Sequence, residues 1–260
     1  MHPRVFASSE IGQLKRVIVH RPDEGIARVS PRQAEELLFD DIVHLPHMQE
    51  EHDIFTDVLR AFLGKENVLE TRQLLLEALN ADAESKQEMM DKISDYEELS
   101  KEQKAYLLSL SNESLTDVLI TGYDGETDFI YFDPIPNFIF TRDIAVTVND
   151  HVVITKAAKE ARFRENFLAR FIFWAHPIFR RLRDEGRIIN LNHVDKFPSS
   201  KKGEVVSMEG GDVMMLSPDY LLIGCSERTN AYAIQLLKDV LFEKGVVKNV
   251  VQINIPKDRA

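Results

Sequence analysis

Four short segments contain the residue types that recognise a small charged molecule. Carboxylates hold a planar cation through paired, charge-assisted hydrogen bonds, and arginines grip a carboxylate in the same way. Acids and arginines together therefore predict a site for a zwitterion with a cationic head, such as a guanidino amino acid. The two segments that supply acids are PNFIFTRD (residues 136–143) and MEGGD (208–212), and the two that supply arginines are KEARFRE (159–165) and GCSERTN (224–230).

Each of these residues also has a simpler interpretation. An Asp at the start of a strand, such as Asp143, is usually a turn or cap residue, and the Gly210-Gly211 pair is more often a bulge than a ligand cradle. Arginines near helix starts oppose the helix dipole. Because Arg162 and Arg228 recur at that position in two similar segments, they favour a bound anion. The prediction of a zwitterion site therefore rests on the acids and arginines together, and no one of these residues supports it alone.

An internal repeat positions these segments. Each copy opens with an Asp and reads as an apolar strand, a polar turn and a second apolar strand, followed by a helix and a β-branched strand. This order predicts an α/β fold of repeated hairpin–helix–strand modules. The two hairpins are DIAVTVNDHVVITK (143–156) and DVMMLSPDYLLIGC (212–225), the helices span about 160–185 and 229–243, and the closing strands are RIINL (187–191) and VVKNVVQINI (246–255).

The first half of the chain has a different composition. It begins with a predicted strand over residues 13–20, a short helix over 31–42 and a helix over 49–63. The following block contains no Gly or Pro up to residue 119 and repeats apolar positions at helical spacing, with a capping box at Ser100 and Gln103. We therefore divide the chain into three parts, which are a first module (1–70), a helical insertion (71–121) and further modules (122–260).

Composition excludes several classes of protein. The 32 Lys and Arg against 43 Asp and Glu give a net charge of −11, so a nucleic-acid-binding face is not expected. No apolar run is long enough for a membrane span, and we expect a cytoplasmic protein. The single cysteine, Cys225, excludes an intrachain disulfide and a multi-cysteine metal site. His44, His47 and His52 lack the spacing of a helical zinc motif, and no metal site is predicted.

The chain resembles the arginine deiminases of the guanidino-group-modifying, or amidinotransferase, superfamily. The resemblance runs in order through EIGQLKRVIVHRP, ELLFDDI, EEHDIF, PNFIFTRD, EGGD and SERTN. It implies an α/β propeller of pseudo-symmetric ββαβ modules, here incomplete, with a helical insertion. It also implies hydrolysis of L-arginine to citrulline and ammonia without metal or cofactor.

The same resemblance assigns roles to individual residues. Asp143 and Glu209 match the acids that bind the guanidinium, and Glu209 also matches the residue that assists proton transfer. Arg162 and Arg228 match the arginines that hold the substrate carboxylate. The positions that match residues lining the substrate site are Leu38, Asn137 and Phe140.

The family's chemistry needs a nucleophilic cysteine and a histidine for acid–base work. Cys225 ends a predicted strand and is not expected to be the nucleophile, so we expect an N-terminal portion that is inactive alone and self-associates. Two alternatives remain. In the first, the chain is a non-catalytic relative that binds a guanidino compound or a protein. In the second, it belongs to an amidinotransferase or an agmatine deiminase, although Arg162 and Arg228 argue against agmatine as the substrate because agmatine has no carboxylate.

Overall fold

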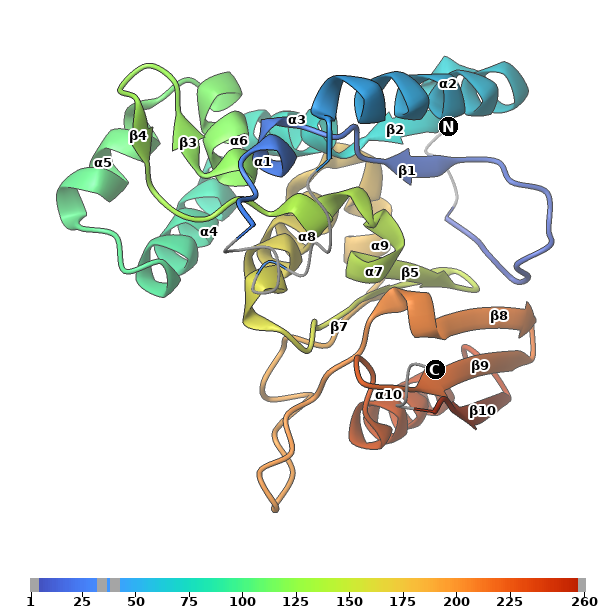
Figure 1. Cartoon of the computed structure of the whole chain (residues 1–260). Helices are drawn as coiled ribbons and strands as arrows, with labels where there is room; N and C mark the ends of the chain where they lie inside the picture. Colours follow the sequence, from blue (N-terminus) through green and yellow to red (C-terminus); the bar gives the residue numbers. More distant parts are fainter. Residues whose placement is uncertain (1–4, 32–36, 38–42, 257–260) are drawn as a thin grey trace. The chain divides into compact units, whose positions relative to one another are not determined.

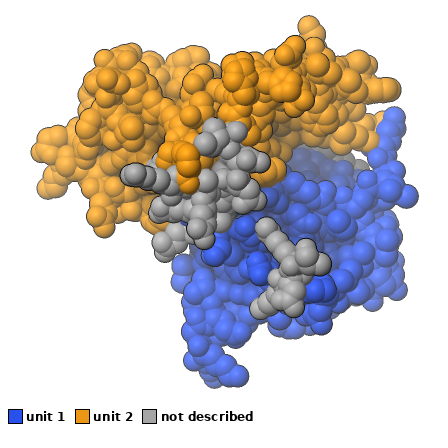
Figure 2. Space-filling view, viewed as in Figure 1, with its two compact units in different colours: residues 1–13, 142–173, 178–260 blue, residues 14–141, 174–177 orange. Residues whose placement is uncertain are grey.

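The computed structural model describes residues 5–31, 37 and 43–256 (Figure 1). The predicted helix over 31–42 lies almost entirely outside these residues. Contacts between Cα atoms divide the chain into two compact units, which Figure 2 colours separately. Unit 1 comprises residues 1–13, 142–173 and 178–260, and unit 2 comprises residues 14–141 and 174–177.

Unit 1 contains two copies of the module that the sequence predicts. Its elements, of which α7, α8 and η4 extend by one or two residues into unit 2, are α7 (Thr141–Ile144), β5 (Ala145–Val148), β6 (His151–Ile154), η3 (Glu160–Arg162), α8 (Phe163–Ala175), η4 (Pro177–Phe179), α9 (Arg180–Asp184), β7 (Ile188–Asn190), η5 (Gly210–Asp212), β8 (Val213–Ser217), β9 (Tyr220–Cys225), α10 (Ala231–Glu243) and β10 (Asn249–Asn254). They form a mixed α/β structure with small sheets.

The two modules have the same strand topology. β5 pairs antiparallel with β6, which pairs parallel with β7; β8, β9 and β10 repeat this arrangement. Both modules bury their strands in one hydrophobic core, to which Val153 of β6, Ile223 of β9 and Leu237 of α10 all contribute. The repeat predicted from the sequence is therefore confirmed as ββαβ units that share a core.

One predicted helix is broken. The sequence predicts a continuous helix over residues 160–185, but α8 ends at Ala175 and Pro177 begins a short 3-10 turn before α9. Proline has no amide hydrogen for the helical ladder and clashes with the preceding turn. The continuous helix was therefore wrong, and Pro177 was the signal against it.

Unit 2 contains a parallel strand pair, a helical block and a short hairpin. Within it, β1 pairs with β2 in parallel and β3 with β4 antiparallel. Its elements are β1 (Val17–Val19), α1 (Glu24–Ala27), α2 (Leu45–Leu63), η1 (Lys65–Asn67), β2 (Val68–Glu70), α3 (Thr71–Ala81), α4 (Ala83–Tyr96), α5 (Lys101–Ser109), α6 (Asn112–Thr121), β3 (Tyr123–Asp124), β4 (Phe129–Ile130) and η2 (Pro136–Ile139).

The helical block is confirmed as four helices, α3 to α6. Side-chain caps define their starts, because Asp82 accepts from the amide of Ser85 and Ser100 forms the predicted capping box with Gln103. Their apolar faces meet in a core that includes Leu75, Met90, Leu107 and Leu119, all fully buried. Among the described residues, no helix combines the length and apolar character that crossing a bilayer requires.

Candidate active site in unit 1

Asp143 lies in α7, directly before strand β5. Its Oδ2 atom accepts from Nη1 of Arg162 at 3.1 Å, and its Oδ1 atom accepts from the amide of Gly211 at 3.1 Å. Its own main-chain oxygen accepts from the hydroxyl of Thr155, just after β6. The carboxylate is thus fixed between the hairpin that follows it and the Gly-Gly segment of the second module.

The EGGD segment, residues 209–212, packs directly against the backbone around Asp143. A Cβ atom on Gly210 would lie 1.9 Å from the carbonyl oxygen of Arg142, so only glycine allows this approach. Arg142 in return donates from Nε to the Gly210 oxygen at 3.2 Å. The glycine pair therefore serves close contact between the two modules, and this contact brings Glu209 near Asp143.

Arg162 connects the predicted acids. Its Nη1 atom donates to Glu209 Oε2 at 2.9 Å as well as to Asp143, and its Nε atom donates to Glu165 Oε2 at 2.9 Å. Only 4% of the residue is exposed, so its charge is compensated by three acids rather than by water. Burial alone would lower the pKa of Arg162, but these carboxylates raise it.

Glu165 is a site residue that the sequence reasoning missed. It is completely buried, and burial raises its pKa to about 7 against the attraction of Arg162. Burial likewise raises the pKa of Glu209. The sequence did contain a signal for Glu165. It follows Arg162 by three residues at the start of a helix, and residues three apart lie on the same helix face.

Several polar atoms of this cluster have no hydrogen-bond partner among the described residues. They include two donors, Nη2 of Arg162 and Nη1 of Arg228, and two acceptors, Oε1 of Glu165 and Oε1 of Glu209. Arg228 lies 3.7 Å from Glu209, within ion-pair range but beyond a hydrogen bond. Buried polar atoms without partners are costly. Donors and acceptors that lack hydrogen bonds and lie in one cluster fit a ligand that carries both charges.

The structure places the three other predicted positions in unit 2 or leaves them undescribed. Asn137 is buried in η2, and its Nδ2 atom donates to the Leu37 oxygen at 2.6 Å. Phe140, which follows η2, has an exposed ring. Leu38 lies outside the described residues. The cluster in unit 1 therefore comprises Asp143, Glu209, Arg162 and Arg228 of the predicted site, together with Glu165.

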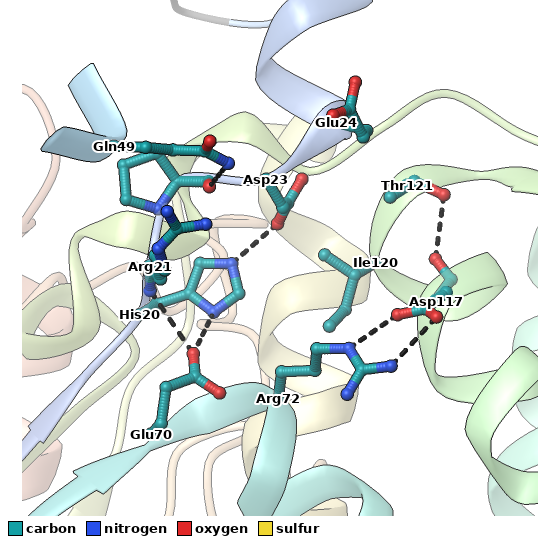
Figure 3. Close-up of a pocket in the computed structure, with 11 residues that line it drawn as sticks. His20, Arg21, Asp23, Glu24, Gln49, Glu70, Arg72, Asp117, Ile120 and Thr121 are labelled. Atoms are coloured by element: carbon teal, nitrogen blue, oxygen red, sulfur yellow. Dashed lines mark hydrogen bonds and ion pairs between the residues drawn. The ribbon is translucent and has the colours of Figure 1, made fainter. Parts of the chain in front are cut away.

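Unit 2 contains an open cavity of about 290 Å³ (Figure 3). Its charged groups largely satisfy one another, since His20 pairs with Asp23 and Glu70 and Arg72 pairs with Asp117. It is lined by His20, Arg21, Pro22, Asp23, Glu24, Gln49, Glu70, Arg72, Asp117, Ile120 and Thr121. None of these is a predicted site residue, so the cluster in unit 1 is the stronger candidate.

The early histidines have other contacts in the described part of the chain, where no group of three or more His, Cys, Asp or Glu side chains is placed to hold an ion. His47 pairs with Glu51 and His52 with Thr56 on α2. In the structure, His47 and His52 thus contact different residues of α2.

Comparison with known proteins identifies the family. The sequence model of arginine deiminase matches residues 35–128 and 122–260. The chain belongs to the arginine deiminase family. The resemblance inferred from the motifs PNFIFTRD and EGGD is thereby confirmed.

Curated arginine deiminases align with the whole chain. The protein from Bacillus cereus (strain ATCC 10987 / NRS 248) is 36% identical over 281 residues, and that from Listeria monocytogenes serotype 4a (strain HCC23) is 32% identical over 283 residues. Each alignment covers all of this chain and 65% of the relative, so this family member spans about two thirds of their length.

Solved structures of dimethylarginine dimethylaminohydrolase are also similar. One from Pseudomonas aeruginosa, in complex with citrulline, has a TM-score of 0.47 and 15% sequence identity, and the match covers 95% of this chain and 64% of that one. An adduct of the same kind of enzyme with 4-chloro-2-hydroxymethylpyridine has a TM-score of 0.43 and 14% identity.

Proposed function

We propose that the cluster around Asp143 and Glu209 binds L-arginine. The observation that supports this is that both carboxylates already hold a guanidinium group, that of Arg162, through its Nη1 atom. A pair of acids that compensates one guanidinium has the geometry and charge to bind another. The unpartnered donors on Arg162 and Arg228 would then bind the ligand carboxylate.

The activity proposed for the protein is that of an arginine deiminase. In this reaction a cysteine thiolate attacks the guanidinium carbon and ammonia leaves, and water then cleaves the sulfur-linked intermediate to release citrulline. Glu209 suits the proton transfers because its pKa is raised by burial. The arginines that recognise a carboxylate favour arginine over agmatine as the substrate.

These 260 residues are proposed not to turn over arginine by themselves. Cys225, the one cysteine of the sequence, ends β9 and packs against the hydrophobic core of unit 1. A half-buried thiol in such a place acts as a small apolar side chain. The position of Cys225 also favours the second candidate, a relative that binds a guanidino compound without hydrolysing it.

We also propose an overall fold, a cellular location and an oligomeric state for the protein. We place the ββαβ units in an α/β propeller, with residues 71–121 as a helical insertion between modules 1–70 and 122–260. The protein is proposed to work in the cytoplasm as a homo-oligomer. Self-association is supported by four side chains of α2 that are each more than half exposed, namely Ile54, Phe55, Val58 and Phe62.

Calorimetric titration with L-arginine tests the binding site. Asp143→Asn and Glu209→Gln keep the size of each side chain and remove its charge, so each is expected to weaken binding at least about tenfold. Asp219→Asn is the matched control, because Asp219 is a half-exposed acid that pairs only with Lys248 among the described side chains. Equal affinities in all three variants would refute the assignment.

A further inference from the structure

The guanidinium of Arg162 occupies the place expected for a ligand's guanidinium. Its Nη1 atom lies 3.1 Å from Asp143 Oδ2 and 2.9 Å from Glu209 Oε2. A ligand cannot donate to the same two oxygens while this atom remains there. In the structure as it stands, the acids of the proposed site are therefore engaged by the chain itself.

Arg162 is held from a second side. Its Nε atom donates to Glu165 at 2.9 Å, and the carboxylate of Glu165 is completely buried. This contact does not involve Asp143 or Glu209, so it can persist when Nη1 leaves them. Glu165 thus holds Arg162 through an atom other than Nη1, so the planar guanidinium can tilt away from Asp143 and Glu209 as a unit while this ion pair is kept.

We propose that Arg162 is an internal competitor that makes the site specific for guanidino acids over guanidino amines. This inference rests on the proposed function and adds a specificity to it. A ligand's guanidinium displaces Nη1 of Arg162 from the two carboxylates. The displaced end then needs a new anion, and a ligand carboxylate supplies one.

The energetic reason is the cost of a poorly compensated buried charge. A guanidino amine binds the two acids but has no carboxylate to pair with Arg162, so Glu165 is then the only acid of the cluster that compensates the Arg162 charge. A guanidino acid exchanges one set of charge-assisted hydrogen bonds for another. The apparent affinity for either ligand is also reduced by the small fraction of molecules in which the acids are free.

Arg228 provides a matched comparison. It is the second arginine of the cluster, but its Nη1 atom lies 3.7 Å from Glu209 Oε1 and makes no hydrogen bond to a described residue. It does not occupy the guanidinium position. Removing Arg228 should weaken binding of a ligand carboxylate without releasing the two acids.

The test measures the affinities of L-arginine and agmatine, which has the guanidinium but no carboxylate. The double variant R162A/E165A removes the guanidinium together with the buried acid that holds its Nε atom, so this acid is not left behind without a partner. Agmatine is expected to bind this variant at least about tenfold more tightly than the wild-type chain, and the preference for arginine over agmatine should fall by a similar factor. Arg228→Ala should weaken arginine binding and give no such gain for agmatine.

The inference is overturned if agmatine binds the double variant no better than the wild-type chain, if neither ligand binds that variant, or if Arg228→Ala gives the same gain. Binding of arginine by the wild-type chain that is lost in Asp143→Asn would still support the proposed function, so the two failures are distinguishable. If circular dichroism shows the double variant to be unfolded, R162K replaces it. Lysine has one terminal nitrogen, whereas Arg162 holds Glu165 through Nε and the other two acids through Nη1, so R162K is expected to loosen the contact with Asp143 and Glu209. A folded R162K without any gain for agmatine overturns the inference.

Discussion

A buried ion pair at His20 should make the stability of unit 2 depend on pH. The imidazole is 2% exposed, its Nε2 atom lies 2.7 Å from Asp23 Oδ2, and its Nδ1 atom lies 3.3 Å from Glu70 Oε1. Burial alone would lower the pKa of His20, but the hydrogen bond to Asp23 and the ion pair with Glu70 raise it from 6.5 to about 9. The folded chain therefore keeps this side chain charged at neutral pH.

The size of the effect follows from proton linkage. A difference of roughly 2.5 pKa units at 1.36 kcal/mol each corresponds to about 3 kcal/mol. Because the pKa is raised on folding, this contribution is fully present below the unfolded pKa of 6.5 and is lost as the pH rises through about 9. His20→Gln removes the titration. The difference in unfolding free energy between wild type and variant should thus fall by about 3 kcal/mol between roughly pH 6 and pH 10.

Urea unfolding followed by tryptophan fluorescence measures this difference. Trp174 is the one tryptophan of the sequence and belongs to unit 2, as His20 does. His47→Gln is the matched control, because the His47 side chain is 68% exposed and pairs only weakly with Glu51. A difference between wild type and His20→Gln that stays constant over this pH range, or the same pH dependence in His47→Gln, would rule out the buried ion pair as its source.

Two further predictions concern a glycine and the cysteine. Gly122→Ala should lose about 3 kcal/mol or more in urea unfolding, because φ is +75° and the new Cβ would lie 1.9 Å from the Phe132 oxygen. Gly186→Ala, with φ of +65° and nothing within 4 Å, should lose only about 1 kcal/mol, and equal losses would contradict the steric argument. Cys225→Ser should leave the affinity for L-arginine within about twofold in calorimetry while lowering stability by about 1 kcal/mol; loss of binding would show that the thiol contacts the ligand.

Much of the fold is local enough to be predicted from the sequence. The absence of Gly and Pro between residues 71 and 119, together with the capping box at Ser100, predicts the helices that the structure shows. The alternating apolar pattern after Asp143 and Asp212 predicts both hairpins. In each case neighbouring residues decide the outcome.

What the sequence does not determine is which charges meet. Motif positions identified Asp143, Glu209 and Arg162 as members of one site, and the structure brings them together. The pairing of Arg162 with Glu209 joins residues 47 positions apart in two different modules, which no local pattern encodes. Glu165 was missed for a related reason, because a Glu on the first turn of a helix is usually a favourable surface charge. Its complete burial is a tertiary property.

We propose that Asp143 and Glu209 form the guanidinium site of a guanidino amino acid. The most direct measurement is a crystal structure of the chain with L-arginine at saturating concentration. We predict that the ligand guanidinium lies within hydrogen-bond distance of both carboxylates, with the ligand carboxylate near Arg228. Arginine bound elsewhere, or Arg162 still seated on both carboxylates beside an empty site, would contradict the account.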